Sequence, residues 1–219
     1  PRPATMPRST AGRILLPVRI CFTSDLHGAT RLYEQLGELL RVETPDLLIL
    51  GGDLFPDGAR DNPLATHVAY IIREFLPRVV AWRTMAPRLT VACCAGNHDW
   101  LCGYEVLEAQ HRAGQVVLLD HQRIWTCGGL HFLGFSSTPP TPHWAKDFER
   151  LDLPTDALPA FDGVVWDREQ RIARPVDLAA HFSPQRALVH DLAQAAPVPA
   201  PWILVAHCRL QKSFHVIRG

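Results

Sequence analysis

Residues 89–99, LTVACCAGNHD, join an apolar run to a polar ending. The run over residues 89–95 has the length and the residue types of a buried strand, and Gly96 permits a sharp backbone turn after it. The polar residues that follow the turn are Asn97, His98 and Asp99. This stretch therefore predicts a strand that brings three polar side chains to one edge of a sheet.

Three other apolar runs end in polar residues of the same kind. These residues are Asp25 and His27 after residues 18–24, Asp53 after residues 46–50, and His207 after residues 202–206. Residues two apart in an extended chain point to the same side, so Asp25 and His27 can address one ion while Leu26 faces away. In an open α/β sheet the carboxyl ends of the strands line a shared crevice, so residues far apart in sequence can meet there.

Two segments between these runs have helical periodicity. Apolar residues recur at three- and four-residue steps over residues 30–43 and 66–85. Pro77 must kink or end the second helix because it lacks a backbone N–H. The alternation of strands and helices predicts an α/β fold.

The chain after residue 122 has a different pattern. Residues 123–135, with Gly128 and Gly129 in the middle, predict two strands joined by a tight turn. Residues 136–182 are rich in Pro and Asp and show little periodicity, which predicts a long ordered insertion. We expect a single domain over residues 14–219 and a disordered segment over residues 1–13, because a chain of this length fits one core.

The composition excludes several classes of protein. Apolar residues make up 47% of the chain and charged residues 20%, as in an ordinary globular protein. Lys plus Arg equals Asp plus Glu at 22 each, which argues against binding nucleic acid by a basic surface. No apolar run approaches the roughly 20 residues that span a bilayer, and the six cysteines lack a metal-finger or disulfide pattern. We expect a cytoplasmic protein with reduced thiols and no contact with a membrane.

The polar residues at the strand ends favour a metal site. Imidazole suits transition metals, whereas carboxylate and amide oxygens keep a site fairly hard, so we expect Mn, Fe or Zn. Two divalent ions about 4 Å apart would repel by roughly 17 kcal/mol at an effective dielectric of 20, so an anion must lie between them. Asp53, with two oxygens, is the candidate bridge. Each Asp or His alone could instead cap a helix or close a turn, but their joint occurrence favours the metal site.

These residues resemble the calcineurin-like metallophosphoesterases. SDLHG, GGDL, GNHD and VAHC match in order that family's DxH, GD, GNH-acid and strand-terminal His signatures. The resemblance implies two mixed β-sheets packed face to face and flanked by helices, as a four-layer sandwich with a dinuclear site. It implies that Asp25 and His27 bind the first ion, that Asp53 bridges, and that Asn97 and His207 bind the second. It also implies that His98 is the acid that protonates the leaving oxygen.

The chain departs from the family pattern in its last residues. Arg209 and Leu210 follow Cys208 where two prolines are common, and the GHxH signature, which supplies one His to each ion, is absent. His215 lies outside any GHxH frame and is interpreted as a bystander. We therefore expect a C-terminally incomplete domain that binds metal weakly.

Other residues have weaker signals. Asp57 and Asp99 are alternatives for the acid that orients His98. Seven histidines lack a partner at ligand spacing and are predicted to have surface or packing roles: His67, His111, His121, His131, His143, His181 and His190. Five residues of the insertion could shape a substrate pocket: Trp144, Lys146, Asp147, Arg150 and Trp166.

The sequence thus predicts hydrolysis of a small phosphorylated substrate by a water that bridges two divalent ions, with His98 and Asp99 as catalytic residues. A phosphodiester is slightly preferred over a phosphomonoester. The alternative is a non-catalytic binding module on the same fold with an incomplete metal site, because a fold alone does not secure a function. A protein Ser/Thr phosphatase is weakened as a third possibility, because GNHD and the insertion differ from that branch. The sequence does not predict the oligomeric state.

Overall fold

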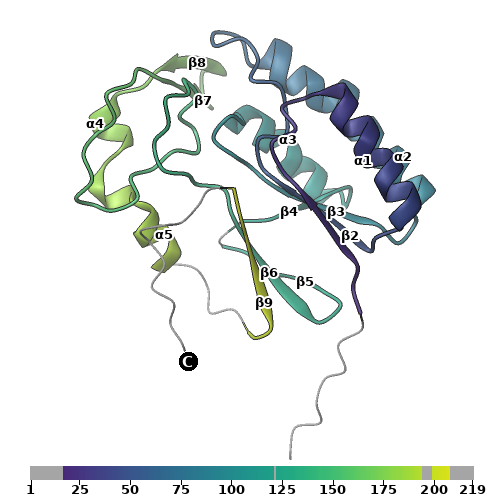
Figure 1. Cartoon of the computed structure of the whole chain (residues 1–219). Coiled ribbons are helices and arrows are strands. Elements are labelled where there is room, and N and C mark those ends of the chain that lie inside the picture. The colour runs from purple at the N-terminus through teal and green to yellow at the C-terminus, as the bar shows by residue number, and fades with distance from the viewer. Residues whose placement is uncertain (1–16, 121, 194–198, 208–219) are drawn as a thin grey trace, which may run out of the picture.

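Four parallel strands form the first sheet of the protein (Figure 1). The structure is a computed structural model and describes residues 17–120, 122–193 and 199–207. In sheet order they are β1 (Ile20–Thr23), β2 (Leu47–Gly51), β3 (Thr90–Cys94) and β4 (Val117–Leu118). The predicted strands before Asp25, Asp53 and Asn97 are confirmed. Every strand pair described in this sheet is parallel. Helical crossovers return the chain to the same edge each time, which imposes that direction.

Helices cover one face of the first sheet. They are α1 (Thr30–Glu43), the π-helical turns η1 (Leu64–Val68) and η2 (Ile71–Phe75), α2 (Leu76–Met85) and α3 (Leu101–Arg112). Leu48 and Leu50 of β2 pack in one apolar cluster with Tyr33, Leu40 and Phe75 of this layer. The predicted interruption near Pro77 is confirmed, since the wide π-turns end directly before α2. The sequence patterns predicted neither α3 nor β4.

A second sheet packs on the other face. It consists of β5 (Trp125–Cys127), β6 (Leu130–Phe135) and β9 (Trp202–Ala206) in the order β5-β6-β9. β5 and β6 are antiparallel whereas β6 and β9 are parallel, so this sheet is mixed. Leu47 and Ile49 of β2 pack in one apolar cluster with Phe132 and Val205 of the second sheet. Alternate residues of β2 therefore pack on opposite faces of the first sheet. The two sheets therefore pack face to face as predicted, and the full four-layer arrangement stays a prediction.

The insertion over residues 136–182 is folded. It contains the antiparallel pair β7 (Val164–Asp167) and β8 (Ile172–Pro175) and the short helix α4 (Leu178–His181). Figure 1 shows these elements on the opposite side of the molecule from α1 and α2. The 3₁₀ turn η3 (Pro184–Arg186) and the helix α5 (Leu188–Ala193) follow.

Across the helices that the structure describes, none combines the length and the apolar character that crossing a membrane requires. The predicted disordered segment 1–13 and His215 lie outside the described residues. The single-domain boundaries stay a prediction.

Candidate metal centre

The loops after β1 and β2 run side by side because their backbones are hydrogen-bonded. The N–H groups of Asp25, His27 and Gly28 donate to the carbonyls of Gly52, Asp53 and Leu54 at 3.0, 2.9 and 2.9 Å. These bonds continue the pairing of the two strands beyond their ends. They place the predicted ligands of both loops at one edge of the sheet, while Leu26 is buried as expected.

Three of the predicted ligands have an unusual backbone. Asp25, His27 and Asp53 have φ values of 58°, 44° and 52°, in the left-handed region. Residues with a Cβ adopt this region infrequently, and such conformations persist only where the surroundings hold them. The inter-loop hydrogen bonds supply that restraint here.

Two glycines allow β2, β3 and β9 to approach closely at the site. A Cβ on Gly96 would lie 2.6 Å from the backbone nitrogen of Asp53 and 2.8 Å from Cδ2 of His207. Gly52 has φ +97°, and a Cβ there would lie 2.6 Å from Nδ1 of His207. A side chain at either position would therefore separate Asp53 from His207.

Asp53 and His207 form a buried pair at the centre of the site. Nε2 of His207 lies 3.2 Å from Oδ2 of Asp53, while its Nδ1 lies 2.9 Å from the carbonyl of Gly51 and donates to it. Burial lowers the pKa of His207, but the hydrogen bond and charge of Asp53 outweigh it and raise that pKa to about 9. Burial raises the pKa of Asp53, but His207 and the amide of His98 lower it below its ordinary value.

The pair fits a cation as well as a proton. With Nδ1–H committed to a backbone carbonyl, Nε2 of His207 faces a carboxylate oxygen, and a cation could take the place of the proton that the two atoms share. A carbonyl that accepts from the second ring nitrogen is the usual support of a metal-binding histidine. The residues present therefore suit a divalent ion between imidazole and carboxylate.

The donor atoms of the site form two groups. Asp25, Asp53 and His207 each offer an atom within 4.8 Å of the others, and so do His27, Asp57 and His98. Nε2 of His27 lies 3.9 Å from Oδ2 of Asp53, which connects the groups. The expected partition differs, since it joins Asp25 to His27 and His207 to Asn97. Which residue holds which ion stays a prediction.

His98 is held from several sides. Its Nδ1 lies 2.8 Å from Oδ1 of Asp57, and its backbone N–H donates to Oδ1 of Asp53 at 2.8 Å. Its ring meets that of His27 edge-on, with centroids 4.9 Å apart and an interplanar angle of 80°. The ring of His143 stacks on it with centroids 3.7 Å apart at 25°. The Asp57 contact leaves Nε2 as the His98 nitrogen able to give a proton to a ligand.

Asp99 makes contacts of another kind. It is buried, and its carboxylate accepts from the backbone N–H groups of Asp53, Leu54 and Gly96 at 2.9, 3.2 and 2.9 Å. Burial and the charge of Asp53 raise the pKa of Asp99 to about 7. Asp99 thus ties the loop after β3 to the loop after β2, and Asp57 is the acid that contacts the His98 ring.

Asn97 points its amide nitrogen into the insertion. Nδ2 donates to Oγ1 of Thr141 at 3.2 Å. This bond leaves the amide oxygen as the Asn97 atom that could bind a cation.

Several remaining side chains make contacts that the sequence did not specify. His143 was predicted to have a surface or packing role, and it stacks on His98, a contact between distant segments that spacing cannot reveal. Lys146 and Trp166 are buried and so line no open pocket. Asp147, also buried, accepts from backbone N–H groups, and Arg150 donates to carbonyls.

His67 confirms the packing prediction, because it is fully buried between the carbonyl of Pro56 and the N–H of Trp100.

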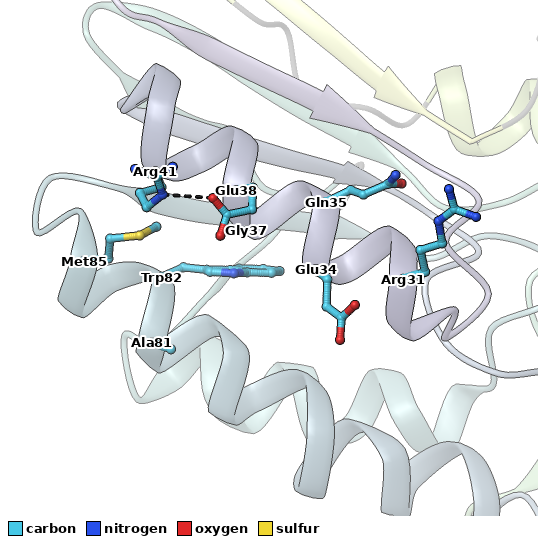
Figure 2. Close-up of a pocket in the computed structure, with 9 residues that line it drawn as sticks. All are labelled: Arg31, Glu34, Gln35, Gly37, Glu38, Arg41, Ala81, Trp82 and Met85. Carbon is cyan, nitrogen blue, oxygen red and sulfur yellow. Dashed lines mark hydrogen bonds and ion pairs between the residues drawn. The ribbon is translucent and has the colours of Figure 1, made fainter.

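A groove also lies between α1 and α2, away from these donor groups (Figure 2). Trp82 lies between the two helices, and Arg41 pairs with Glu38 beside it at 2.9 Å. The residues that line the groove are Arg31, Glu34, Gln35, Gly37, Glu38, Arg41, Ala81, Trp82 and Met85. None belongs to the candidate metal centre.

A family model described as calcineurin-like phosphoesterase matches residues 18–210. The chain is 19% identical to TT1561 of Thermus thermophilus, a crystal structure, over 58% of this chain and 55% of that chain, with a TM-score of 0.38. A second crystal structure is 13% identical over 61% of this chain and 58% of the other, with a TM-score of 0.40. The chain thus spans somewhat more than half the length of each, and no curated protein matches it.

Proposed function

Because this chain belongs to the calcineurin-like phosphoesterase family, we propose that it hydrolyses small phosphoesters with two divalent ions held by Asp25, His27, Asp53, Asn97 and His207. Mn, Fe and Zn suit these donors. The observation that carries the proposal is the Asp53–His207 pair, in which Nδ1 of the imidazole is committed to Gly51 and Nε2 faces a carboxylate oxygen. When bound, the ions would neutralise phosphoryl oxygens and make a water molecule more acidic.

The residues around the ions have distinct proposed roles. Asp53, buried and at the junction of the two donor groups, bridges them. Asp57 accepts the Nδ1 proton of His98, which fixes the tautomer and directs Nε2 to the leaving oxygen of the substrate. Asp99 keeps the two loops together through backbone amides and is thereby a positioning residue. A phosphodiester is the preferred substrate class.

The test replaces His98 by Asn. We expect His98→Asn to keep its Mn²⁺ and to lose at least about tenfold in turnover of an aryl phosphodiester, since a positioned acid contributes about a hundred- to ten-thousandfold. Exposed His190 provides the matched control, and His190→Asn should behave as the unchanged protein. Full turnover in His98→Asn would remove that residue from the mechanism. A chain that takes up no Mn²⁺ in equilibrium dialysis would favour the non-catalytic binding module.

A further inference from the structure

A buried ion pair lies in the insertion beside Asn97. Lys146 and Glu149 are both 0% exposed, and Nζ of Lys146 lies 2.8 Å from Oε2 of Glu149. Nζ also donates to the carbonyls of Thr141, at 2.7 Å, and of His143. An ammonium group has three donors, so Lys146 has a partner for each of them. A buried pair is stable only when its remaining polar atoms are satisfied in this way.

Glu149 orients the hydroxyl of Thr141. Oε1 of Glu149 lies 2.5 Å from Oγ1 of Thr141. A carboxylate paired with an ammonium group can only accept, so the hydroxyl proton of Thr141 points to Glu149. The oxygen of that hydroxyl then offers only lone pairs to its other neighbours.

Those lone pairs are used by two N–H donors. Oγ1 of Thr141 accepts from the backbone N–H of His143 at 3.2 Å and from Nδ2 of Asn97 at 3.2 Å. The two ends of an amide have nearly the same shape, so the hydrogen-bond network decides which end faces a given neighbour. A flipped Asn97 would place its oxygen against lone pairs with no proton between them. The network therefore favours the orientation with the nitrogen on Thr141.

We propose that Lys146, Glu149 and Thr141 form a relay that positions Asn97 with its amide oxygen directed to the metal centre. The relay rests on the proposed function, because it matters only if Asn97 is a ligand. Amide oxygens bind cations, whereas an amide NH₂ group only donates hydrogen bonds. The insertion thus acts on the metal centre without contributing a ligand.

The test removes the hydroxyl of Thr141 and counts bound Mn²⁺ by electron paramagnetic resonance, which detects free Mn²⁺. We expect Thr141→Val to weaken the Mn²⁺ site that contains Asn97 by about 10- to 100-fold, as loss of a ligand's supporting partner does. Thr141→Ser keeps the hydroxyl and should restore the affinity. Thr138, in the same segment, is buried, and its hydroxyl has no hydrogen-bond partner within the part of the chain that the structure describes. Thr138→Val is therefore the matched control and should leave the affinity unchanged.

A double-mutant cycle separates positioning from general damage to the fold. If Thr141 acts through Asn97, Thr141→Val should cost no further affinity in an Asn97→Ala background. An equal loss in both backgrounds would overturn the relay, and so would unchanged affinity in Thr141→Val. If Thr141→Val does not fold, the comparison of Thr141→Ala in the two Asn97 backgrounds decides in the same way. Failure of the unchanged protein to bind Mn²⁺ would overturn the metal centre itself, and the relay with it.

Discussion

Two regions meet at the candidate metal centre, and different interactions hold each of them in place. The strand-end loops, residues 24–28, 51–57 and 96–99, are positioned by hydrogen bonds of their backbone groups, some of which donate to the buried Asp99 carboxylate, and by glycines that permit close approach. The insertion, residues 136–182, is positioned by buried charged side chains, among them Asp147 and the Lys146–Glu149 pair. The first region offers the proposed ligand atoms, and the second contacts side chains at the proposed site, Asn97 and His98. A change in the loops should therefore affect the ions directly, whereas a change in the insertion should act through another residue.

The largest effect is expected in the strand-end loops at Asp53. Asp53→Asn removes the negative charge that offsets the repulsion between two cations. One unit charge at 4 Å is worth about 4 kcal/mol at an effective dielectric of 20, which corresponds to roughly a thousandfold in affinity. We expect a loss of that order in Mn²⁺ binding by equilibrium dialysis, together with loss of turnover. Asp61, exposed in the neighbouring loop, is the control as Asp61→Asn. Two tightly held ions in Asp53→Asn would show that another group bridges.

The positions of the strand-end loops could be predicted from the sequence because they follow from the order and direction of the strands. Asp25, Asp53 and Asn97 lie in the loops just beyond parallel strands, and such strands end at a common edge. The role of Asp57 was left open, because it depends on the path of a loop after Gly52 that no periodicity encodes. The sequence therefore predicted which polar side chains lie at this edge better than it predicted the groups that orient them.

The insertion could be recognised but not interpreted from its sequence. Its Pro-rich, aperiodic pattern predicted an ordered segment, yet Lys146 was expected near a pocket and is 0% exposed. The sequence did contain one indication of the buried ion pair: the opposite charges of Lys146 and Glu149 are three residues apart in a segment with aromatic residues. The stacking of His143 on His98 joins residues 45 positions apart through side chains alone, so spacing carries no trace of it.

The next largest effect is expected at Asp147, which connects the insertion to the start of α3. Asp147 accepts from the N–H of Leu101 at the start of α3 and from the N–H of Trp166 in β7, both at 2.8 Å. Asp147→Ala leaves two donors without a partner, at about 1 to 3 kcal/mol for a buried group. We expect the free energy of unfolding in urea to fall by about 3 kcal/mol. Asp162→Ala, at an exposed position of the insertion, should change little, and equal stability of both variants would contradict this docking.

The dependence of protein stability on pH should reveal the burial of His67, which packs next to the strand-end loops. Burial lowers the pKa of His67 from 6.5 to about 4. The unfolded chain therefore takes up a proton near pH 6.5 and the folded protein only near pH 4, so stability decreases as the pH falls between these values. His67 should contribute about 2 kcal/mol of this decrease between pH 7 and pH 5.

The variant His67→Gln isolates that contribution. Glutamine can donate to the carbonyl of Pro56 and accept from the N–H of Trp100, but it does not titrate. Urea unfolding at pH 7 and pH 5 should show a smaller decrease in His67→Gln than in the unchanged protein. Parallel decreases would assign the acid sensitivity to other groups, such as His181, whose pKa burial also lowers to about 4.

The smallest effect is expected where the insertion touches the proposed acid. The ring of His143 stacks on His98, and aromatic pairs of this kind contribute about 0.5 to 1.5 kcal/mol. His143→Ala should therefore reduce turnover of an aryl phosphodiester by about fivefold, which corresponds to about 1 kcal/mol. Bound Mn²⁺ should not change, because His143 is not one of the proposed ligands.

His143→Phe shows which part of the side chain matters. Phenylalanine keeps a ring to stack on His98 and removes Nε2, a buried atom without a hydrogen-bond partner among the described residues. We expect turnover within about twofold of the unchanged protein, and a higher free energy of unfolding because an unsatisfied buried group is removed. A fivefold loss in both variants would assign the effect to the ring nitrogen, and the insertion would then contribute a chemical group to the site and not only a contact.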